Sequence, residues 1–344
     1  MHIPDGYLSP ATVAVAYGAA APFWYQAGKR VKETLRGQSA PLVALFAAFS
    51  FTIQMFNIPV PGGTTAHAVG GTLMAVVLGP WAAVVGVSTA LVIQALFFGD
   101  GGITAIGANC FNMGIALPLV GYALYRLLAG HSPSPRRRAV AAAVGGYIGI
   151  NTAGLLAGLE LGIQPLLWSE GGRALYNPYG LDVTLPAMML VHLTLAGFAE
   201  AALTGLGVAF LLRSHPALLG EAAAGASGNG LGRAGWSLVS VLGAMVVLAP
   251  LGLLAPGGAE FEWGKSELEG MVGYVPSGLA RLADSWQLAP LRGYQAPGMG
   301  PDSSFLQQAP AYILSAVVGV ACIFVLLFAA RVALGRPASA ARRD

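Results

Sequence analysis

The chain has 344 residues, of which 56% are hydrophobic and only 10% are charged, and its mean hydropathy is +0.67. About a quarter of the residues of a soluble globular protein are usually charged, so the composition excludes that class. The net charge of +3, from 18 basic and 15 acidic residues, is too balanced for a nucleic-acid partner. Glycine-rich apolar runs are instead typical of packed transmembrane helices.

Nine apolar runs approach the length of about 17–25 residues that a transmembrane helix needs. They cover residues 10–28, 40–57, 65–80, 81–98, 103–129, 139–160, 186–213, 236–255 and 310–335. A Gly-Pro-Trp sequence at 79–81 separates the third run from the fourth, because proline interrupts helical hydrogen bonding. The sequence therefore predicts an all-α integral membrane protein with about nine transmembrane helices.

The distribution of basic residues predicts the orientation of these helices. Lysine and arginine are concentrated in the connections after the first, fifth, seventh and ninth helices. Because basic loops stay on the cytoplasmic side, we expect the N-terminus outside and the C-terminus in the cytoplasm. Residues 1–9 lack the basic start of a signal peptide. The sequence thus predicts a retained N-terminus on a multi-pass protein of the bacterial inner membrane.

The hydropathy pattern divides the chain into two units. Residues 1–213 hold seven helices with short connections, and residues 214–235 form a linker whose glycine, alanine and serine content is typical of a flexible segment. Residues 236–344 hold two more helices on either side of an outer loop, 256–309, which is long enough to have its own function. Its acidic residues, a pattern usually found on a solvated face, are Glu260, Glu262, Glu267 and Glu269.

Polar side chains within the apolar runs gather near the outer ends of the helices. They are Gln54, Asn57, His67, Gln94, Asn109, Asn151 and His192. Since polar residues in membrane helices are commonly functional, we expect a polar pocket that opens outward. Asn109, Asn151 and His192 fit interhelical hydrogen bonding better than metal ligation. Glu200, near the middle of the seventh helix, is either a neutralised buried acid or a coupling residue, and both interpretations stay open.

His2 indicates a specific metal chemistry at the outer face. The Met1 amine, the His2 backbone nitrogen and the His2 imidazole can chelate one metal in a plane if the amide loses its proton, and His67 can supply the fourth nitrogen. Four nitrogens in a plane suit Ni²⁺ or Cu²⁺. The dipole at a helix N-terminus favours a neutral His67 ring, which is the ligating form. Taken singly, a histidine at position two usually belongs to an unstructured terminus, and a membrane histidine usually bonds a backbone carbonyl.

Two motifs resemble those of a known family. Met1-His-Ile-Pro-Asp-Gly-Tyr-Leu-Ser-Pro10 is similar to the N-terminus of the CbiM/NikM family, the substrate-binding components of energy-coupling-factor transporters for cobalt and nickel. The stretch Pro61-Gly-Gly-Thr-Thr-Ala-His67 resembles the second signature of that family. The resemblance implies a substrate component at 1–213 and a fused auxiliary N component after it. It also implies that the ligands are the Met1 amine, the His2 amide and imidazole, and the His67 imidazole.

The same resemblance implies the substrate-capture component of an ATP-driven importer, and not an enzyme. The expected cargo is Ni²⁺ or Co²⁺, with no permanently bound cofactor, and the expected partners are a transmembrane coupling subunit and cytoplasmic ATPase subunits. The Ile3-Pro-Asp-Gly6 start is closer to nickel members. The outer loop has Pro276-Ser-Gly-Leu-Ala280 where the auxiliary component often has Pro-Asp-Gly-Leu-Glu, so we assign it no direct metal role. Docking of this loop on the pocket stays open.

Three other functions fit a polytopic membrane protein. A cobalt-specific importer of the same type would use the same fold. A gradient-driven secondary transporter normally has inverted repeats and interrupted helices at the midplane, whereas the polar residues here lie near the outer face. An intramembrane serine protease needs a buried serine, but the Gly-x-Ser-Gly sequence at 225–228 lies in the predicted cytoplasmic linker. We therefore expect nickel binding that depends on a free, unextended N-terminus.

Overall fold

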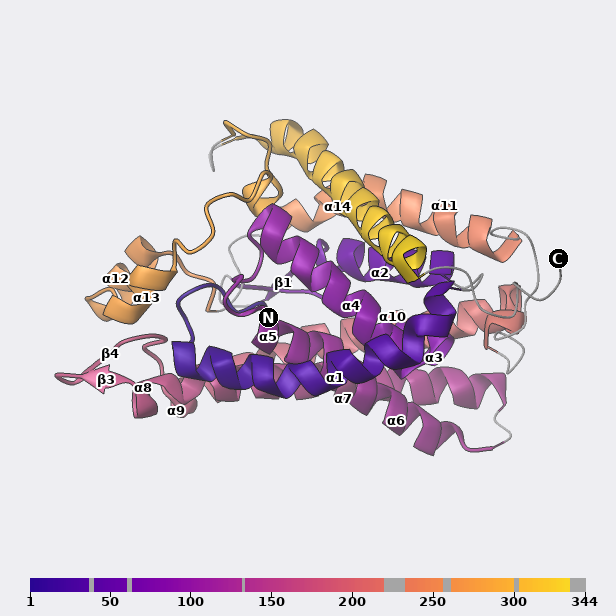
Figure 1. Ribbon diagram of the computed structural model, residues 1–344, viewed down its shortest axis with the longest axis horizontal. Helices are drawn as coiled ribbons and strands as arrows, with labels where there is room; N and C mark the ends of the chain where they lie inside the picture. The colour runs from indigo at the N-terminus through magenta and orange to yellow at the C-terminus, as the bar shows by residue number, and fades with distance from the viewer. Residues whose placement is uncertain are drawn as a thin grey trace.

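The computed structural model describes residues 1–36, 40–60, 64–131, 134–219, 233–255, 261–299 and 303–334. It is a bundle whose longest helices run in roughly the same direction (Figure 1). Within these residues, six helical stretches are long and apolar enough to cross a membrane: Pro80–Phe98, Ile106–Ala129, Pro135–Leu167, Leu181–Ser214, Gly235–Leu254 and Phe305–Leu334. The structure therefore agrees with a multi-pass, helical membrane protein.

The first three predicted spans are the ones that these criteria do not confirm. Helix α1 (Pro10–Arg36) has 27 residues and includes the basic residues near its end, whereas α2 (Ala40–Gln54) has 15 and α3 (Gly71–Leu78) has only 8. The prediction of one spanning helix over 65–80 is wrong, because residues 65–70 belong to a strand and a turn.

The predicted break between the third and fourth runs is confirmed. Helix α3 ends at Leu78, and α4 (Pro80–Ile93) begins at Pro80. Gly79 between them has φ +88, a backbone conformation that favours glycine over residues with a side chain. Proline at the first position of α4 fits because that position needs no hydrogen-bonded N–H. The two helices are therefore separate elements.

A short hairpin precedes α3 and positions His67. Strands β1 (Ile58–Val60) and β2 (Thr64–Ala66) pair in antiparallel register, with Ile58 opposite Ala66. Glu200 binds the segment after β2. Its Oε2 accepts hydrogen bonds from the backbone N–H groups of Val69 at 2.7 Å and Gly70 at 2.9 Å. Glu200 thus fixes the chain just after His67, and its predicted alternative role in coupling is untested.

Three π-helical segments interrupt the helices near the polar residues. Segment η1 (Gln94–Phe98) continues α4, and η2 (Cys110–Ala116) joins α5 (Ile106–Asn109) to α6 (Leu117–Ala129). Segment η3 (His192–Ala196) joins α9 (Leu181–Val191) to α10 (Gly197–Ser214). Such π-bulges are frequent at functional sites, because the extra residue turns side chains to a new face. Gln94 and His192 are the first residues of η1 and η3, and Asn109 directly precedes η2.

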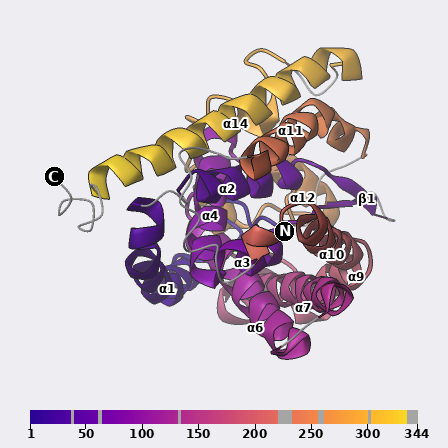
Figure 2. The same ribbon diagram turned by 90° about the vertical axis from the view of Figure 1, so that its right-hand side faces the viewer.

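Helix α7 and the auxiliary unit complete the bundle. The remaining helical elements are α7 (Pro135–Gly162), α8 (Gln164–Leu167), η4 (Pro216–Leu219), α11 (Arg233–Leu248), η6 (Ala249–Leu254), α12 (Lys265–Val272), α13 (Ser277–Leu282), η7 (Arg292–Tyr294) and α14 (Phe305–Leu334), and a second hairpin pairs β3 (Ser169–Glu170) with β4 (Arg173–Ala174). Helices α11 and α14 both contact α2 (Figure 2). The predicted linker at 214–235 is described only at its ends, and residues 220–232 lie outside the described residues.

The two ends of the bundle differ in what they carry. Elements α12, α13, β3 and β4 extend from one end, and the C-terminal ends of α1, α6, α10 and α14 lie toward the other (Figure 1). Those C-terminal ends hold basic residues, among them Arg126, Arg213 and Arg331. This separation is what the positive-inside rule requires. The first end is called the outer end, and its assignment to the outside stays a prediction.

Helix α14 packs against α2 through a glycine, which gives a test of the fold. A Cβ on Gly319 would lie 2.1 Å from Cζ of the buried Phe51 ring. We expect Gly319→Ala to destabilise the protein by about 1–3 kcal/mol, as overpacking of a core does, measured by thermal unfolding in detergent. Gly243→Ala in α11, where nothing lies within 4 Å, is the matched control. Equal stability of the two variants would contradict the packing of α14 on α2.

Candidate metal site

The N-terminal segment, residues 1–9, runs into the bundle instead of lying on its surface. Met1 is 7% exposed, His2 4% and Ile3 1%. Tyr7 and Leu8 are also buried, so apolar side chains anchor the segment by the burial of their surface. A chain end is usually frayed, and here it is part of the core.

Asn109 holds the backbone of this segment at Ile3. The Ile3 N–H donates to Asn109 Oδ1 at 2.8 Å, and Asn109 Nδ2 donates to the Ile3 carbonyl at 3.1 Å. The same carbonyl accepts from the Gly102 N–H at 2.9 Å. Because buried backbone groups need partners, this pair of bonds defines where the chain end lies. The prediction that Asn109 bonds between helices is wrong, since its partner is the N-terminal segment.

Asp5 fixes the turn that follows. Its carboxylate accepts hydrogen bonds from the Ile103 N–H at 3.2 Å and from the Thr104 N–H and hydroxyl at 2.8 and 2.5 Å. Gly102 allows this close approach, because a Cβ there would lie 2.3 Å from the Asp5 nitrogen. The Pro-Asp-Gly sequence of the motif is therefore a structural lock between the N-terminal segment and residues 102–104.

The outer loop also contacts this turn, at Gly6 and Tyr7. Gly6 has φ +90, and a Cβ on it would lie 2.7 Å from the Leu279 carbonyl oxygen in α13, so both the conformation and the contact require glycine. The Tyr7 hydroxyl donates to the Trp263 carbonyl at 2.9 Å. Docking of the loop on the pocket, left open by the sequence, is what the structure shows.

The imidazole rings of His2 and His67 face one another. Their centroids are 5.1 Å apart and their planes are tilted by 34°. His67 Nδ1 lies 3.1 Å from the Ala68 carbonyl, and His2 Nδ1 lies 3.3 Å from Asp100 Oδ1. A carbonyl only accepts hydrogen bonds, so His67 Nδ1 carries the hydrogen and Nε2 carries the lone pair. Both Nε2 atoms are buried and have no hydrogen-bond partner among the described residues.

The environment of His67 favours its neutral form. His67 lies in the turn before α3, outside the six apolar stretches. Burial, together with the positive charge of the N-terminus, lowers the pKa of His67 well below its usual range. Neutral imidazole is the form that binds a metal ion, so the site keeps one ligand ready without competition from a proton.

Met1 lines a small cavity together with two histidines. The cavity measures about 10 Å³ and is lined by Met1, Thr65, Ala66, His67, Met188, Val191 and His192. Such a volume is close to that of one water molecule or one ion. The Met1 amine lies 3.5 Å from Glu262 Oε1 of the outer loop, a side chain 26% exposed. Residues 1, 67 and 192 therefore border one small cavity beside the outer loop.

Side chains alone do not form a metal cluster in the described part of the chain. No group of three or more histidine, cysteine, aspartate or glutamate residues is arranged to hold an ion there. The Met1 amine and the His2 amide are backbone nitrogens of the segment that carries the His2 ring.

The other predicted pocket residues have different partners. His192 Nδ1 lies 2.7 Å from the Met188 carbonyl, and Asn151 Nδ2 donates to the Tyr147 carbonyl, both within their own helices. The prediction that these two side chains bond between helices is therefore wrong. Gln54 Nε2 likewise donates within its helix, to the Ser50 carbonyl. Half-buried Asn57 lies beside η6, where a Cβ on Gly252 would lie 3.0 Å from the backbone nitrogen of Asn57.

Sequence reasoning missed Asp100 and Tyr294. Asp100 contacts His2, and Tyr294 donates to Asp100 Oδ2 at 2.5 Å. The run Gly99-Asp-Gly-Gly102 after an apolar segment was a signal for Asp100, because an isolated charge among glycines at a helix end is rarely structural packing. Nothing in the sequence near Tyr294 indicates a partner almost two hundred residues away. Glu262 was predicted to be on a solvated face, and it contacts the Met1 amine instead.

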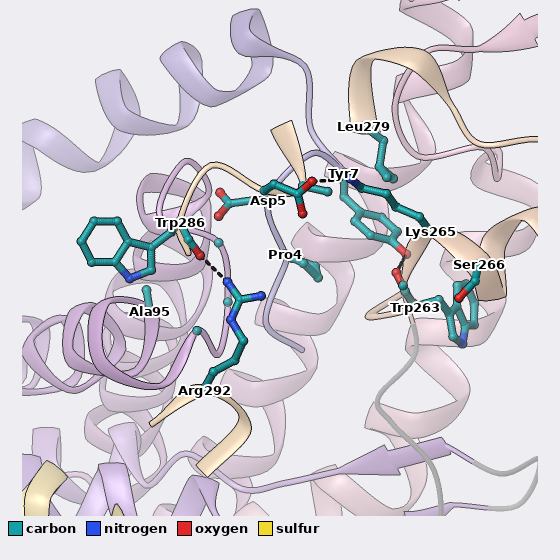
Figure 3. Close-up of a pocket in the computed structure, with 16 residues that line it drawn as sticks. Pro4, Asp5, Tyr7, Ala95, Trp263, Lys265, Ser266, Leu279, Trp286 and Arg292 are labelled. Carbon is teal, nitrogen blue, oxygen red and sulfur yellow. Dashed lines mark hydrogen bonds and ion pairs between the residues drawn. The ribbon is translucent and has the colours of Figure 1, made fainter. Parts of the chain in front are cut away.

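A larger cavity of about 500 Å³ lies between the N-terminal segment and the outer loop (Figure 3). Asp5 and Tyr7 line it from the N-terminal segment, and Trp286 and Arg292 line it from the loop. Gly101 also lines this cavity, and a Cβ on it would lie 3.4 Å from Cδ2 of His2. Gly101 therefore lines the outer cavity and also lies next to the His2 ring.

Comparison with known proteins decides the family. Residues 2–218 match the family model described as CbiM, cobalt uptake substrate-specific transmembrane region. The chain belongs to the CbiM family. With its six apolar helices, this CbiM-family chain is a multi-pass membrane protein, and the resemblance inferred from the two motifs is confirmed.

Relatives extend the similarity to the auxiliary unit. A protein named fused nickel transport protein NikMN, from Rhodobacter capsulatus, is 50% identical over 94% of this chain and 95% of its own. A probable fused nickel transport protein LarMN, from Lactiplantibacillus plantarum, is 41% identical over 95% of this chain and 96% of its own. A crystal structure titled as a truncated transition metal transporter has a TM-score of 0.59 and 53% identity, covering 62% of this chain and all of that one.

The two bonds between Asn109 and Ile3 give a test of how the chain end is held. Asn109→Ala leaves the buried Ile3 N–H unpaired, which costs about 1–3 kcal/mol. We expect opening of residues 1–9 to rise about tenfold or more, measured as faster hydrogen–deuterium exchange of the N-terminal peptide. Asn151→Ala, whose side chain bonds within its own helix, serves as the control. Unchanged exchange in Asn109→Ala would show that other contacts hold the terminus.

Proposed function

We propose that this chain is the substrate-capture component of a nickel importer and that it binds Ni²⁺ through its own N-terminus. The observation that carries the proposal is the small cavity that the buried residue Met1 lines together with His67. The His2 ring lies 5.1 Å from the His67 ring. Together these groups supply one amine nitrogen and two imidazole rings.

The proposed ligands are four nitrogens. Met1 supplies its amine, His2 supplies its amide nitrogen and its imidazole, and His67 supplies Nε2. The first three belong to two consecutive residues, so their spacing along the chain favours a flat arrangement. Nitrogen ligands in a square plane suit Ni²⁺. The bonds that hold Ile3 and Asp5 fix the backbone of the segment, so the two backbone nitrogens are positioned before the ion arrives.

The relatives support nickel as the cargo. The relatives from Rhodobacter capsulatus and Lactiplantibacillus plantarum, which match both units of this chain, are named as nickel transport proteins. Cobalt is the second candidate, because the family model is described by cobalt uptake and a 35% identical relative from Geobacter sulfurreducens, matched over 76% of this chain, is named cobalt transport protein CbiM. The planar nitrogen set favours nickel over cobalt, and the visible spectrum of the bound ion distinguishes them.

We also propose that transport energy comes from other subunits. The expected partners are a transmembrane coupling subunit and cytoplasmic ATPase subunits, and the chain itself is not an enzyme. The N-terminal segment that supplies three of the proposed ligands contacts the outer loop, whereas a secondary transporter normally binds its substrate near the midplane. Nickel uptake that needs no ATPase subunits and follows an ion gradient would support the secondary transporter instead.

Substitution of the histidines tests the ligand set. We expect His2→Ala and His67→Ala to weaken Ni²⁺ binding by more than about tenfold, or about 1.4 kcal/mol, and to abolish the yellow absorption of planar nickel. The measurement is metal titration with visible spectroscopy on purified protein with a native N-terminus. His192→Ala, which changes the same cavity, should keep the planar spectrum. Loss of the spectrum in His192→Ala and its retention in His67→Ala would contradict the proposed set.

A further inference from the structure

A chain of contacts connects the outer loop to the His2 ring. The Tyr294 hydroxyl donates to Asp100 Oδ2 at 2.5 Å, and Asp100 Oδ1 lies 3.3 Å from His2 Nδ1. Gln94 Nε2 donates to the Tyr294 oxygen at 3.3 Å. Asp100 is 19% exposed, and the Tyr294 side chain is almost fully buried. The auxiliary unit therefore contacts His2 through one carboxylate.

Tyr294 is held firmly in this position. Its ring stacks on Phe98, with centroids 4.8 Å apart and an interplanar angle of 16°, and packs against Tyr312 and Phe51. Its backbone has φ +61, a conformation that non-glycine residues rarely adopt and that persists only where the surroundings impose it. Strain of this kind at a buried side chain is often connected with function.

The contact with Asp100 involves the nitrogen that a chelate needs. A metal bound to the His2 amide can reach the ring of the same residue only through Nδ1, because Nε2 points away on the far side of the imidazole. Asp100 lies against Nδ1. A protonated Nδ1 paired with this carboxylate has no lone pair to give to a metal, so that pairing and the planar chelate exclude each other.

We propose that Asp100, held in place by Tyr294 of the outer loop, is a latch that competes with the metal for Nδ1 of His2. This inference rests on the proposed nickel chelate. The protein has two arrangements of the His2 ring, one on Asp100 and one on the metal, and binding must displace the first. A state that must be displaced lowers the apparent affinity by its share of the population. The outer loop thereby sets how tightly the ion is held and how readily it leaves.

The latch predicts a change in metal affinity opposite in direction to the change that a supporting role predicts. If Asp100 competes, removal of its charge strengthens metal binding and slows metal release. If Asp100 instead orients the ring for ligation through Nε2, as carboxylates behind metal-bound histidines do, its removal weakens binding. A general structural defect would also weaken binding. The direction of the change therefore separates the latch from both other roles.

The experiment measures nickel binding to the full chain with a native N-terminus, for wild type, Asp100→Asn, Tyr294→Phe and the double variant. We expect Asp100→Asn to lower the Kd for Ni²⁺ about tenfold, or about 1.4 kcal/mol, and to slow transfer of the ion to a chelator. Tyr294→Phe should change both in the same direction by a smaller factor. The double variant should match Asp100→Asn, because Tyr294 acts through Asp100.

Tyr312→Phe is the matched control. Tyr312 is in the same aromatic cluster, but its hydroxyl donates to the Met55 carbonyl, so it should bind nickel as the wild type does. Weaker or unchanged binding by Asp100→Asn, with the planar spectrum present in the wild type, overturns the latch and leaves the proposed function intact. Absence of planar nickel in the wild type overturns the proposed function and the latch with it.

Discussion

The structure depends on the burial of a free chain end in an apolar bundle. An unpaired charge or an unbonded backbone group is costly there, so each polar atom of residues 1–9 needs a partner. The Met1 amine lies beside Glu262, the Ile3 backbone bonds to Asn109, and the Asp5 carboxylate accepts from residues 103 and 104. These contacts explain why the motif includes proline, aspartate and glycine in addition to the histidine. A ligand made of backbone atoms is useful only when the backbone is fixed.

The auxiliary unit is part of this arrangement and not an appendage. Its loop supplies Glu262 to the amine, the Trp263 carbonyl to Tyr7, α13 to Gly6, and Tyr294 to Asp100. Three of these contacts are on the N-terminal segment and the fourth is on Asp100 beside His2, so they couple the position of the loop to that of the proposed ligands. Any movement of the loop changes the surroundings of His2. Fusion of the two units in one chain keeps this loop at high effective concentration over the site.

Hydropathy predicted the helical segments well and the turns poorly. Runs such as 81–98 and 103–129 agree with α4–η1 and α5–α6, because apolar length is the main requirement for a membrane helix. The run 65–80 failed because the chain folds back there as a hairpin and a turn, which apolar composition does not reveal. The π-helical interruptions were not predicted either. Contacts such as Tyr294–Asp100–His2 span long sequence distances and leave no local pattern.

The proposed N-terminal ligands follow from position and chemistry, because only a histidine next to a free amine can form this chelate. The most direct test adds one residue before Met1 and compares nickel binding with that of the native chain by visible absorption and metal analysis. The account predicts one nickel with a yellow, planar-type spectrum in the native form and its loss in the extended form. Equal binding by both forms would contradict the terminal chelate and would move the site to the interior, with His192 and Asn109 as the leading ligands.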